Sequence, residues 1–223
     1  MNMMFVPASS PEPVGQYVAG NIAAQLADNR TVLWLLSGGS AIAVAVAASK
    51  HLAGQNLSGI TASLIDERFG PVGNPQSNWR QLQDAGFELA GAALHPVLDG
   101  ASQSDTAEAF DGFLHTEFNR ADFHIGLLGI GPDGHTSGIL PHSPAVTALV
   151  LATAYDGGAF RRITTTPRAL SYLDEAVVYA VGRSKWPVLD RLETDMPFAE
   201  QPAQALKAAT KLTIFTDRPQ PRS

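Results

Sequence analysis

The chain has 223 residues, 45% of them hydrophobic and 16% charged, which is the composition of a globular protein and not of a disordered one. Its formal net charge of −6 argues against a broad nucleic-acid-binding or anionic-membrane surface, because both partners select basic proteins. The absence of cysteine excludes disulfides, thiol nucleophiles and cysteine-ligated metals.

Helical and strand patterns alternate along the chain. Helices are predicted at residues 10–28, 41–52, 78–85, 102–120, 183–192 and 199–207. Strands are predicted at residues 31–36, 61–65, 94–97, from 123 to a glycine-rich loop, and at 146–153, 163–166, 175–181 and 211–216. This alternation favours a doubly wound, mostly parallel, Rossmann-like α/β sheet that is wrapped by helices on both faces. Since no repeat, linker or low-complexity tract interrupts it, residues 1–223 are predicted to form a single domain.

Neither a secretion signal nor a membrane segment is predicted. Residues 1–6 are too short for the apolar part of a signal peptide, lack a basic flank and run directly into Pro7. No uninterrupted apolar run approaches the length that crosses a bilayer. We therefore expect a cytoplasmic protein with no membrane or nucleic-acid partner.

The strand that begins at Phe123 leads into the most informative loop of the chain, Gly129-Ile130-Gly131-Pro132-Asp133-Gly134-His135-Thr136-Ser137. Its three glycines allow sharp turns and a close approach of the backbone to a ligand. A lone histidine is usually structural or exposed. His135, however, lies at a strand end two residues from Asp133, a position that suits a general base. Asp133 could assist it or could only shape the loop.

The glycines of this loop also match the dinucleotide-binding fingerprint by letter, with Asp156 roughly twenty residues further on. That fingerprint requires a helix of several turns after its third glycine. Residues 135–144 contain two prolines and little helical pattern. Binding of NAD is therefore not expected.

Other strand ends carry residues that suit an anion. The turn Ser37-Gly38-Gly39-Ser40 joins a strand to a helix, so its amides could hold a phosphate, although an ordinary glycine-rich turn explains it equally well. By itself, Asp66-Glu67-Arg68 is more often a solvated loop, but an inward Arg68 would offer a planar fork for phosphate. Lys185 and the pair Arg161-Arg162 are either surface residues or the remaining cations of such a pocket.

Taken together, these residues resemble the motifs of 6-phosphogluconolactonases in order and spacing. The matching segments are Ser37-Gly38-Gly39-Ser40, Asp66-Glu67-Arg68 with Ser77-Asn78 downstream, the loop at 129–137, Arg162-Ile163-Thr164 and Gly182-x-x-Lys185. The resemblance covers about residues 31–192, and Gly-Pro-Asp-Gly-His is its most specific part. It implies a Rossmann-like monomer or small homo-oligomer that binds a sugar phosphate lactone without a metal or any other cofactor.

The resemblance also implies an activity, the hydrolysis of 6-phospho-D-glucono-1,5-lactone in the oxidative pentose phosphate pathway. A lactone is an activated ester, so a base that deprotonates water suffices without a covalent nucleophile. His135 would be this base, with Asp133 beside it, and amides of the glycine-rich loop would stabilise the oxyanion. The implied substrate-binding residues are Gly38, Gly39, Ser40, Asp66, Arg68, Asn78, Gly131, Arg162 and Lys185.

Two alternatives stay open. Glucosamine-6-phosphate deaminases resemble this pattern, but they carry Asp-Glu-Tyr where this chain has Arg68 as the third residue, and Asn-Glu-Pro soon after the histidine. The corresponding segment here, Gly138-Ile139-Leu140-Pro141, has no glutamate for ring opening and ammonia release. A non-catalytic sugar-phosphate sensor would keep the pocket and need no base.

The chain also departs from the lactonase pattern. Lactonases usually have a proline pair before the arginine that precedes Ile-Thr, whereas this chain has Gly157-Gly158-Ala159-Phe160 before Arg161-Arg162. Which of these two arginines faces the substrate is left open.

Overall fold

In the computed structural model, which describes residues 2–219, seven strands form one sheet and three strands form a second, smaller sheet. The large sheet has the order β1-β10-β9-β6-β2-β3-β5, and every neighbouring pair is parallel. Its strands are β1 (Asn2–Pro7), β2 (Val32–Leu36), β3 (Ile60–Leu64), β5 (Ala93–His95), β6 (Phe123–Leu128), β9 (Glu175–Tyr179) and β10 (Lys211–Thr216). The small sheet is antiparallel, in the order β4 (Asp66–Arg68), β8 (Arg161–Thr165) and β7 (Ala152–Asp156).

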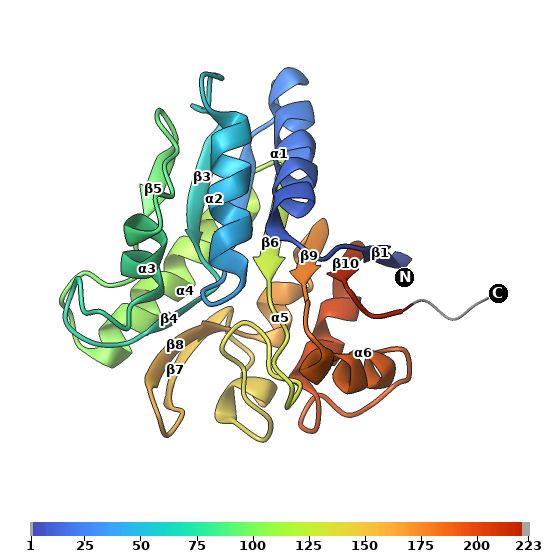
Figure 1. Ribbon diagram of the computed structural model, residues 1–223. Coiled ribbons are helices and arrows are strands. Elements are labelled where there is room, and N and C mark those ends of the chain that lie inside the picture. The colour runs from blue at the N-terminus through green and yellow to red at the C-terminus, as the bar shows by residue number, and fades with distance from the viewer. Residues whose placement is uncertain (1, 220–223) are drawn as a thin grey trace.

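Helices cover both faces of the large sheet (Figure 1). The helices α1 (Pro11–Ala27) and α2 (Ala41–Leu52) lie side by side in front of it, and α4 (Gln103–Arg120) lies behind it. The shorter helices are α3 (Asn78–Asp84), α5 (Pro167–Leu170) and α6 (Trp186–Leu192), with 3₁₀ turns η1 (Pro144–Thr147), η2 (Arg183–Lys185) and η3 (Pro202–Ala208). The predicted doubly wound, mostly parallel α/β architecture is confirmed. No helix within residues 2–219 is both long enough and apolar enough to cross a membrane.

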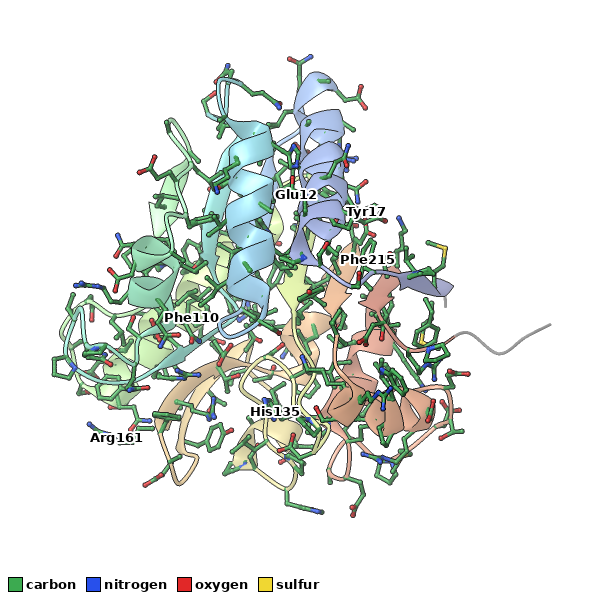
Figure 2. The ribbon with its side chains drawn as sticks, in the orientation of Figure 1. Glu12, Tyr17, Phe110, His135, Arg161 and Phe215 are labelled. Carbon is green, nitrogen blue, oxygen red and sulfur yellow. The ribbon has the colours of Figure 1, made fainter. Side chains whose placement is uncertain are left out.

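The core lies between the sheet and these helices. All five residues of β2 are buried, as expected for a parallel strand with both faces covered. Val14, Val18 and Ile22 of α1 recur every four residues and are fully buried, and each contributes roughly 1.5–3 kcal/mol through burial. Figure 2 shows that Tyr17 of α1 also lies against Phe215 of β10, with ring centroids 5.1 Å apart.

The strand order reverses between β2 and β6, at the centre of the sheet. From β2 the chain proceeds outward through β3 to β5, and α4 then returns it to β6 on the other side of β2. From β6 it continues outward through β9 and β10. In open α/β sheets the crevice at such a reversal, beyond the carboxyl ends of the strands, is where ligands bind. The Ser37–Ser40 turn and the loop at 129–137 both follow strands at this point.

Several local predictions are wrong. Strand β1 and helix α5 were not predicted, and Asp66-Glu67-Arg68 forms strand β4 and not a loop. The strand predicted at 146–153 does not exist as such, because η1 and an exposed turn precede β7. The amides of residues 151 and 152 both donate to Oδ1 of Asp111 on α4, at 2.6 and 2.9 Å, so a side chain takes the place of a neighbouring strand there. The helix predicted at 199–207 is the 3₁₀ turn η3.

Candidate active site

A pocket of about 220 Å³ lies at the strand-order reversal. Its lining residues come from the ends of β2 and β6, from β4 and β8, from the start of α3 and from η2: Ser37, Gly38, Gly39, Ser40, Asp66, Arg68, Asn78, Gly129, Ile130, Gly131, His135, Ser137, Gly138, Arg162 and Lys185. The structure thus brings every predicted substrate-binding residue and His135 into one cavity, whereas Asp133 contacts His135 but is not among the lining residues. Five other lining residues were not predicted as site residues: Ser37, Gly129, Ile130, Ser137 and Gly138. Their only signal is their place in or beside the two glycine-rich turns at 37–40 and 129–137.

The loop after β6 is folded onto itself by short hydrogen bonds. Thr136 donates its hydroxyl to the carbonyl of Gly129 at 2.8 Å, and the amide of Gly131 donates to the carbonyl of His135 at 2.9 Å. A Cβ atom on Gly131 would lie 2.2 Å from the imidazole of His135, so glycine is required for this ring position. Residues 135–143 contain no helix, in agreement with the rejection of a dinucleotide fold.

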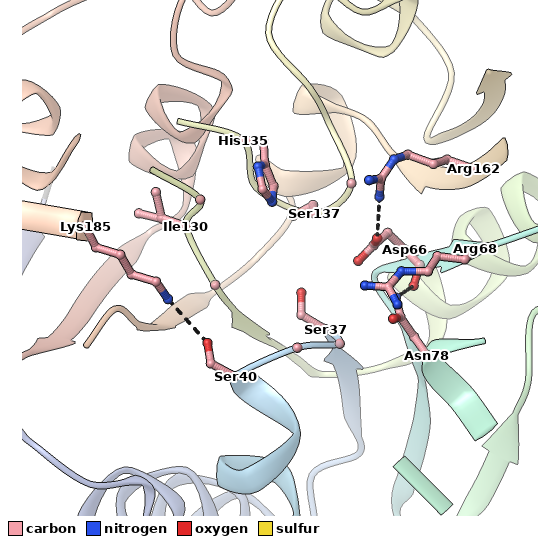
Figure 3. A pocket seen from close by; sticks show the side chains of 15 residues that line it. Ser37, Ser40, Asp66, Arg68, Asn78, Ile130, His135, Ser137, Arg162 and Lys185 are labelled. Atoms are coloured by element: carbon pink, nitrogen blue, oxygen red, sulfur yellow. Dashed lines mark hydrogen bonds and ion pairs between the residues drawn. The ribbon is translucent and has the colours of Figure 1, made fainter. Parts of the chain in front are cut away.

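His135 is held by the carboxylate of Asp133. Nδ1 of the ring lies 2.6 Å from Oδ1, and the main-chain N–H of His135 donates to the same oxygen at 3.1 Å. Partial burial acts to raise the pKa of Asp133, but the contacts with His135 outweigh it and lower the pKa below its usual value. An ionised carboxylate accepts a hydrogen bond from the N–H at Nδ1, which keeps the ring proton on that nitrogen and leaves the lone pair of a neutral ring on Nε2. Figure 3 shows the ring reaching into the pocket.

Glu67 is a structural residue that sequence reasoning did not identify. Its carboxylate is fully buried and accepts four hydrogen bonds, two on each oxygen. Oε1 accepts from the amides of Arg68 and Asn78, at 2.6 and 2.7 Å, and Oε2 accepts from the hydroxyl of Ser77 at 2.7 Å and the amide of Trp79 at 3.2 Å. Burial raises the pKa of Glu67 although these donors act to lower it. Glu67 thereby joins β4 to the start of α3.

This junction orients three pocket residues. Because side chains alternate along a strand, Asp66 and Arg68 face the pocket while Glu67 faces α3. Asn78 is the first residue of α3 and donates its side-chain amide to the carbonyl of Asp66 at 2.9 Å. Ser77 caps the helix by accepting from the amide of Arg80.

The charged residues lie on two sides of the pocket, with His135 between them (Figure 3). On one side, Nη1 of Arg162 lies 3.7 Å from Oδ2 of Asp66, and Arg68 is next to this pair. On the other side, Lys185 donates to the hydroxyl of Ser40 at 3.4 Å. The lining of the pocket therefore carries three cations and one carboxylate, which suits an anionic ligand.

The structure answers which of the paired arginines faces this pocket. Arg162 lines it, whereas Arg161 is exposed and stacks on Phe69, with its Cζ atom 4.8 Å from the ring centroid. Figure 2 shows Arg161, the first residue of β8, on the outside of the molecule and away from His135. The alternation of side chains along β8 accounts for the difference.

Burial also shifts the pKa values of two charged residues of the pocket, Asp66 and Lys185. It raises the pKa of Asp66, although Arg162 and Arg68 act against the shift. It lowers the pKa of Lys185. A bound anion would stabilise the charged form of the lysine. Within residues 2–219, no cluster of three or more His, Asp or Glu side chains has the geometry to hold a metal ion.

Comparisons with known proteins agree with this geometry. A family model described as glucosamine-6-phosphate isomerases/6-phosphogluconolactonase matches residues 8–215. A 6-phosphogluconolactonase of Rhizobium meliloti is 28% identical over 96% of this chain and 97% of its own length. One from Synechocystis is 30% identical over 69% of this chain and 68% of its own length.

Solved structures share the fold. The crystal structure of 6-phosphogluconolactonase from Thermotoga maritima superposes with a TM-score of 0.79 at 21% identity, covering 96% of this chain and 99% of its own. The 6-phosphogluconolactonase from Plasmodium vivax has a TM-score of 0.80 at 16% identity, over 96% of this chain and 90% of its own.

Proposed function

We propose that this chain, which belongs to the glucosamine-6-phosphate isomerase/6-phosphogluconolactonase family, hydrolyses 6-phospho-D-glucono-1,5-lactone to 6-phospho-D-gluconate. The observation that carries the proposal is an imidazole held by a carboxylate in the same pocket as three cations. The names of the relatives support it. We further propose, as expectations of the same kind, that residues 1–223 act as one domain, as a monomer or small homo-oligomer in the cytoplasm. Residue 1 and residues 220–223 lie outside the described part of the chain.

In the proposed reaction, Nε2 of His135 takes a proton from a water molecule that attacks the lactone carbonyl carbon. The carbonyl oxygen becomes an oxyanion, which amides of the glycine-rich loop stabilise. The ring ester bond then breaks, and the departing oxygen takes the proton from the imidazolium, so that water has been added across the ester. Asp133 keeps the ring in the required tautomer and stabilises its protonated form.

The cations and polar turns position the substrate in this scheme. Arg68, Arg162 and Lys185 attract the phosphorylated lactone, with the Gly38-Gly39-Ser40 turn beside them. Holding the carbonyl carbon next to the base converts an intermolecular reaction into one within a complex. Asp66 and Asn78 orient Arg162 and the sugar hydroxyls.

The deaminase alternative is disfavoured by the carboxylates of the pocket. Among the lining residues only Asp66 carries one, and it faces Arg162. The segment after the loop contributes Gly138, which has no side chain to act as an acid. Opening an amino-sugar ring and releasing ammonia would need such a group.

The test is a coupled assay with freshly generated lactone, corrected for spontaneous hydrolysis. The wild-type protein is expected to exceed the spontaneous rate, and His135→Ala is expected to abolish the excess while still binding 6-phosphogluconate. An unchanged rate in the variant would rule out the base role. Normal 6-phosphogluconate binding without turnover in the wild type would identify a sensor, and ammonia release from glucosamine 6-phosphate would identify a deaminase.

A further inference from the structure

Two arginines of the pocket have few partners for their donors. Among the described residues, the side chain of Arg68 makes one hydrogen bond, to the carbonyl of Gln76 at 3.3 Å, and Arg162 makes only the 3.7 Å ion pair with Asp66. In the part of the chain that the structure describes, Nε of each arginine is buried and has no hydrogen-bond partner. Each guanidinium offers five N–H donors, and the Nη groups, which make only these two contacts within the described residues, are the donors that can meet a ligand in the pocket.

Both guanidiniums stack on the same aromatic ring. The Cζ atoms of Arg68 and Arg162 lie 4.8 and 5.9 Å from the ring centroid of Phe160. Two neighbouring cations repel each other, whereas the face of an aromatic ring attracts each of them. Phe160 does not line the pocket itself, so any effect it has on a ligand acts through the arginines.

The hairpin between β7 and β8 is built to bring this ring over the arginines. The amide of Gly157 donates to the carbonyl of Phe160 at 2.9 Å and closes the turn. A Cβ atom at Gly157 would lie 2.9 Å from Nε of Arg162, so the glycine lets the turn wrap closely around that side chain. The Gly157–Phe160 segment is also where the chain departs from the proline pair usual in lactonases.

We propose that Phe160 is a positioning residue that holds Arg68 and Arg162 together as one receptor for the phosphate of the substrate. It sets the affinity for the phosphorylated end of the ligand and leaves the chemical step to His135. The identity of the substrate in this proposal rests on the proposed function. The recognition of a phosphate monoester does not, because it needs only the two guanidiniums and their unpaired donors.

The chain offers a matched control for this idea. Phe69 stacks on Arg161 with its ring centroid 4.8 Å from Cζ, but Arg161 is exposed and lies away from the pocket. Phe160→Leu and Phe69→Leu therefore remove the same kind of contact, one at the site and one outside it. Phe160→Tyr keeps the aromatic face and should restore whatever the leucine variant loses.

The experiment measures binding of 6-phosphogluconate and of gluconate by calorimetry, together with kcat and KM for the lactone. Phe160→Leu is expected to weaken 6-phosphogluconate binding about 5- to 30-fold and to raise KM by a similar factor, with kcat changed less than twofold. Phe69→Leu and Phe160→Tyr are expected to match the wild type. Thermal melting of each variant checks that it is folded.

Three results would overturn the proposal. They are wild-type affinity in Phe160→Leu, an equal loss of gluconate and 6-phosphogluconate binding, and a failure of Phe160→Tyr to restore affinity when it is folded. If the wild type does not hydrolyse the lactone but Phe160→Leu selectively loses 6-phosphogluconate binding, the proposed function fails and the positioning role of Phe160 stands.

Discussion

Replacing Asp133 by asparagine is expected to lower kcat for the lactone more than tenfold and to leave KM nearly unchanged. The 2.6 Å contact joins Nδ1 of His135 to an ionised carboxylate, and hydrogen bonds to charged groups are worth about 1.5–3 kcal/mol. Since 39% of the His135 side chain and 51% of the Asp133 side chain are exposed, the lower end of this range applies, which is about a tenfold effect.

Asparagine adds a second effect that alanine does not. Its amide can donate to Nδ1, which would place the ring proton on Nε2 and remove the base. Asp133→Ala leaves the ring free to adopt either tautomer, so it should lose only about tenfold. We therefore expect kcat to fall in the order wild type, Asp133→Ala, Asp133→Asn.

The opposite order would show that Asp133 does not act by setting the tautomer of His135. Oδ1 of Asp133 also accepts from the main-chain N–H of His135, and an asparagine oxygen can replace it in that bond. If Asp133 only shapes the loop, Asp133→Asn will behave like the wild type and Asp133→Ala will be impaired. The coupled lactone assay at neutral pH decides between the two, with 6-phosphogluconate binding as the check that the pocket is intact.

Three further predictions concern the site and its support. Gly131→Ala should reduce kcat at least 100-fold in the same assay, because its Cβ would meet the His135 ring. The control Gly129→Ala should be nearly neutral, because its Cβ meets nothing closer than 3.9 Å. Equal effects of the two variants would contradict the steric argument. Burial lowers the pKa of Lys185 from its usual 10.5, so the cationic form is lost as the pH rises through that lower value. Calorimetry should therefore show that, as the pH is raised, 6-phosphogluconate binding begins to weaken before pH 10.5 is reached. A Lys185→Arg variant should stay flat over this range, and a flat wild-type profile would show that the charge of Lys185 does not contribute to ligand binding. Glu67→Gln leaves two buried donors without an acceptor, which costs about 2–5 kcal/mol of folding free energy. Thermal melting should therefore show a Tm lowered by roughly 5–15 °C. An unchanged Tm would mean that water replaces the lost acceptor.

Much of the architecture could be predicted because it depends on local patterns. The fully apolar run at 32–36 and the helical spacing of Val14, Val18 and Ile22 determine burial wherever they occur in a parallel sheet. The pocket could be anticipated for a related reason. Polar turns at the carboxyl ends of parallel strands meet at one edge of the sheet, so His135 and the Ser37–Ser40 turn had to be neighbours.

The remainder depends on contacts between distant parts of the chain. Strand β4 pairs with β8, which follows it by almost a hundred residues, and nothing near Asp66 encodes this partner. Glu67 appears as one more charge until the start of α3 folds over it. The contact of Phe160 with Arg68 and Arg162 could not be predicted from the sequence, because a hairpin turn brings the ring over two arginines that belong to different strands.

The edge of the large sheet has a consequence for how the protein is made. Strand β1 is the first described element to leave the ribosome, and among the described strands it pairs only with β10, the last of them in the chain. The pocket loops and the strands that carry them can therefore assemble before β10 is synthesised, while β1 is still unpaired. We expect the contacts of β1 to form late, because they join the two ends of the described chain. Substitutions that weaken them, for example at Phe5, should then speed unfolding and leave the folding rate largely unchanged. Growth of the chain thus separates formation of the pocket end of the sheet from closure of its edge.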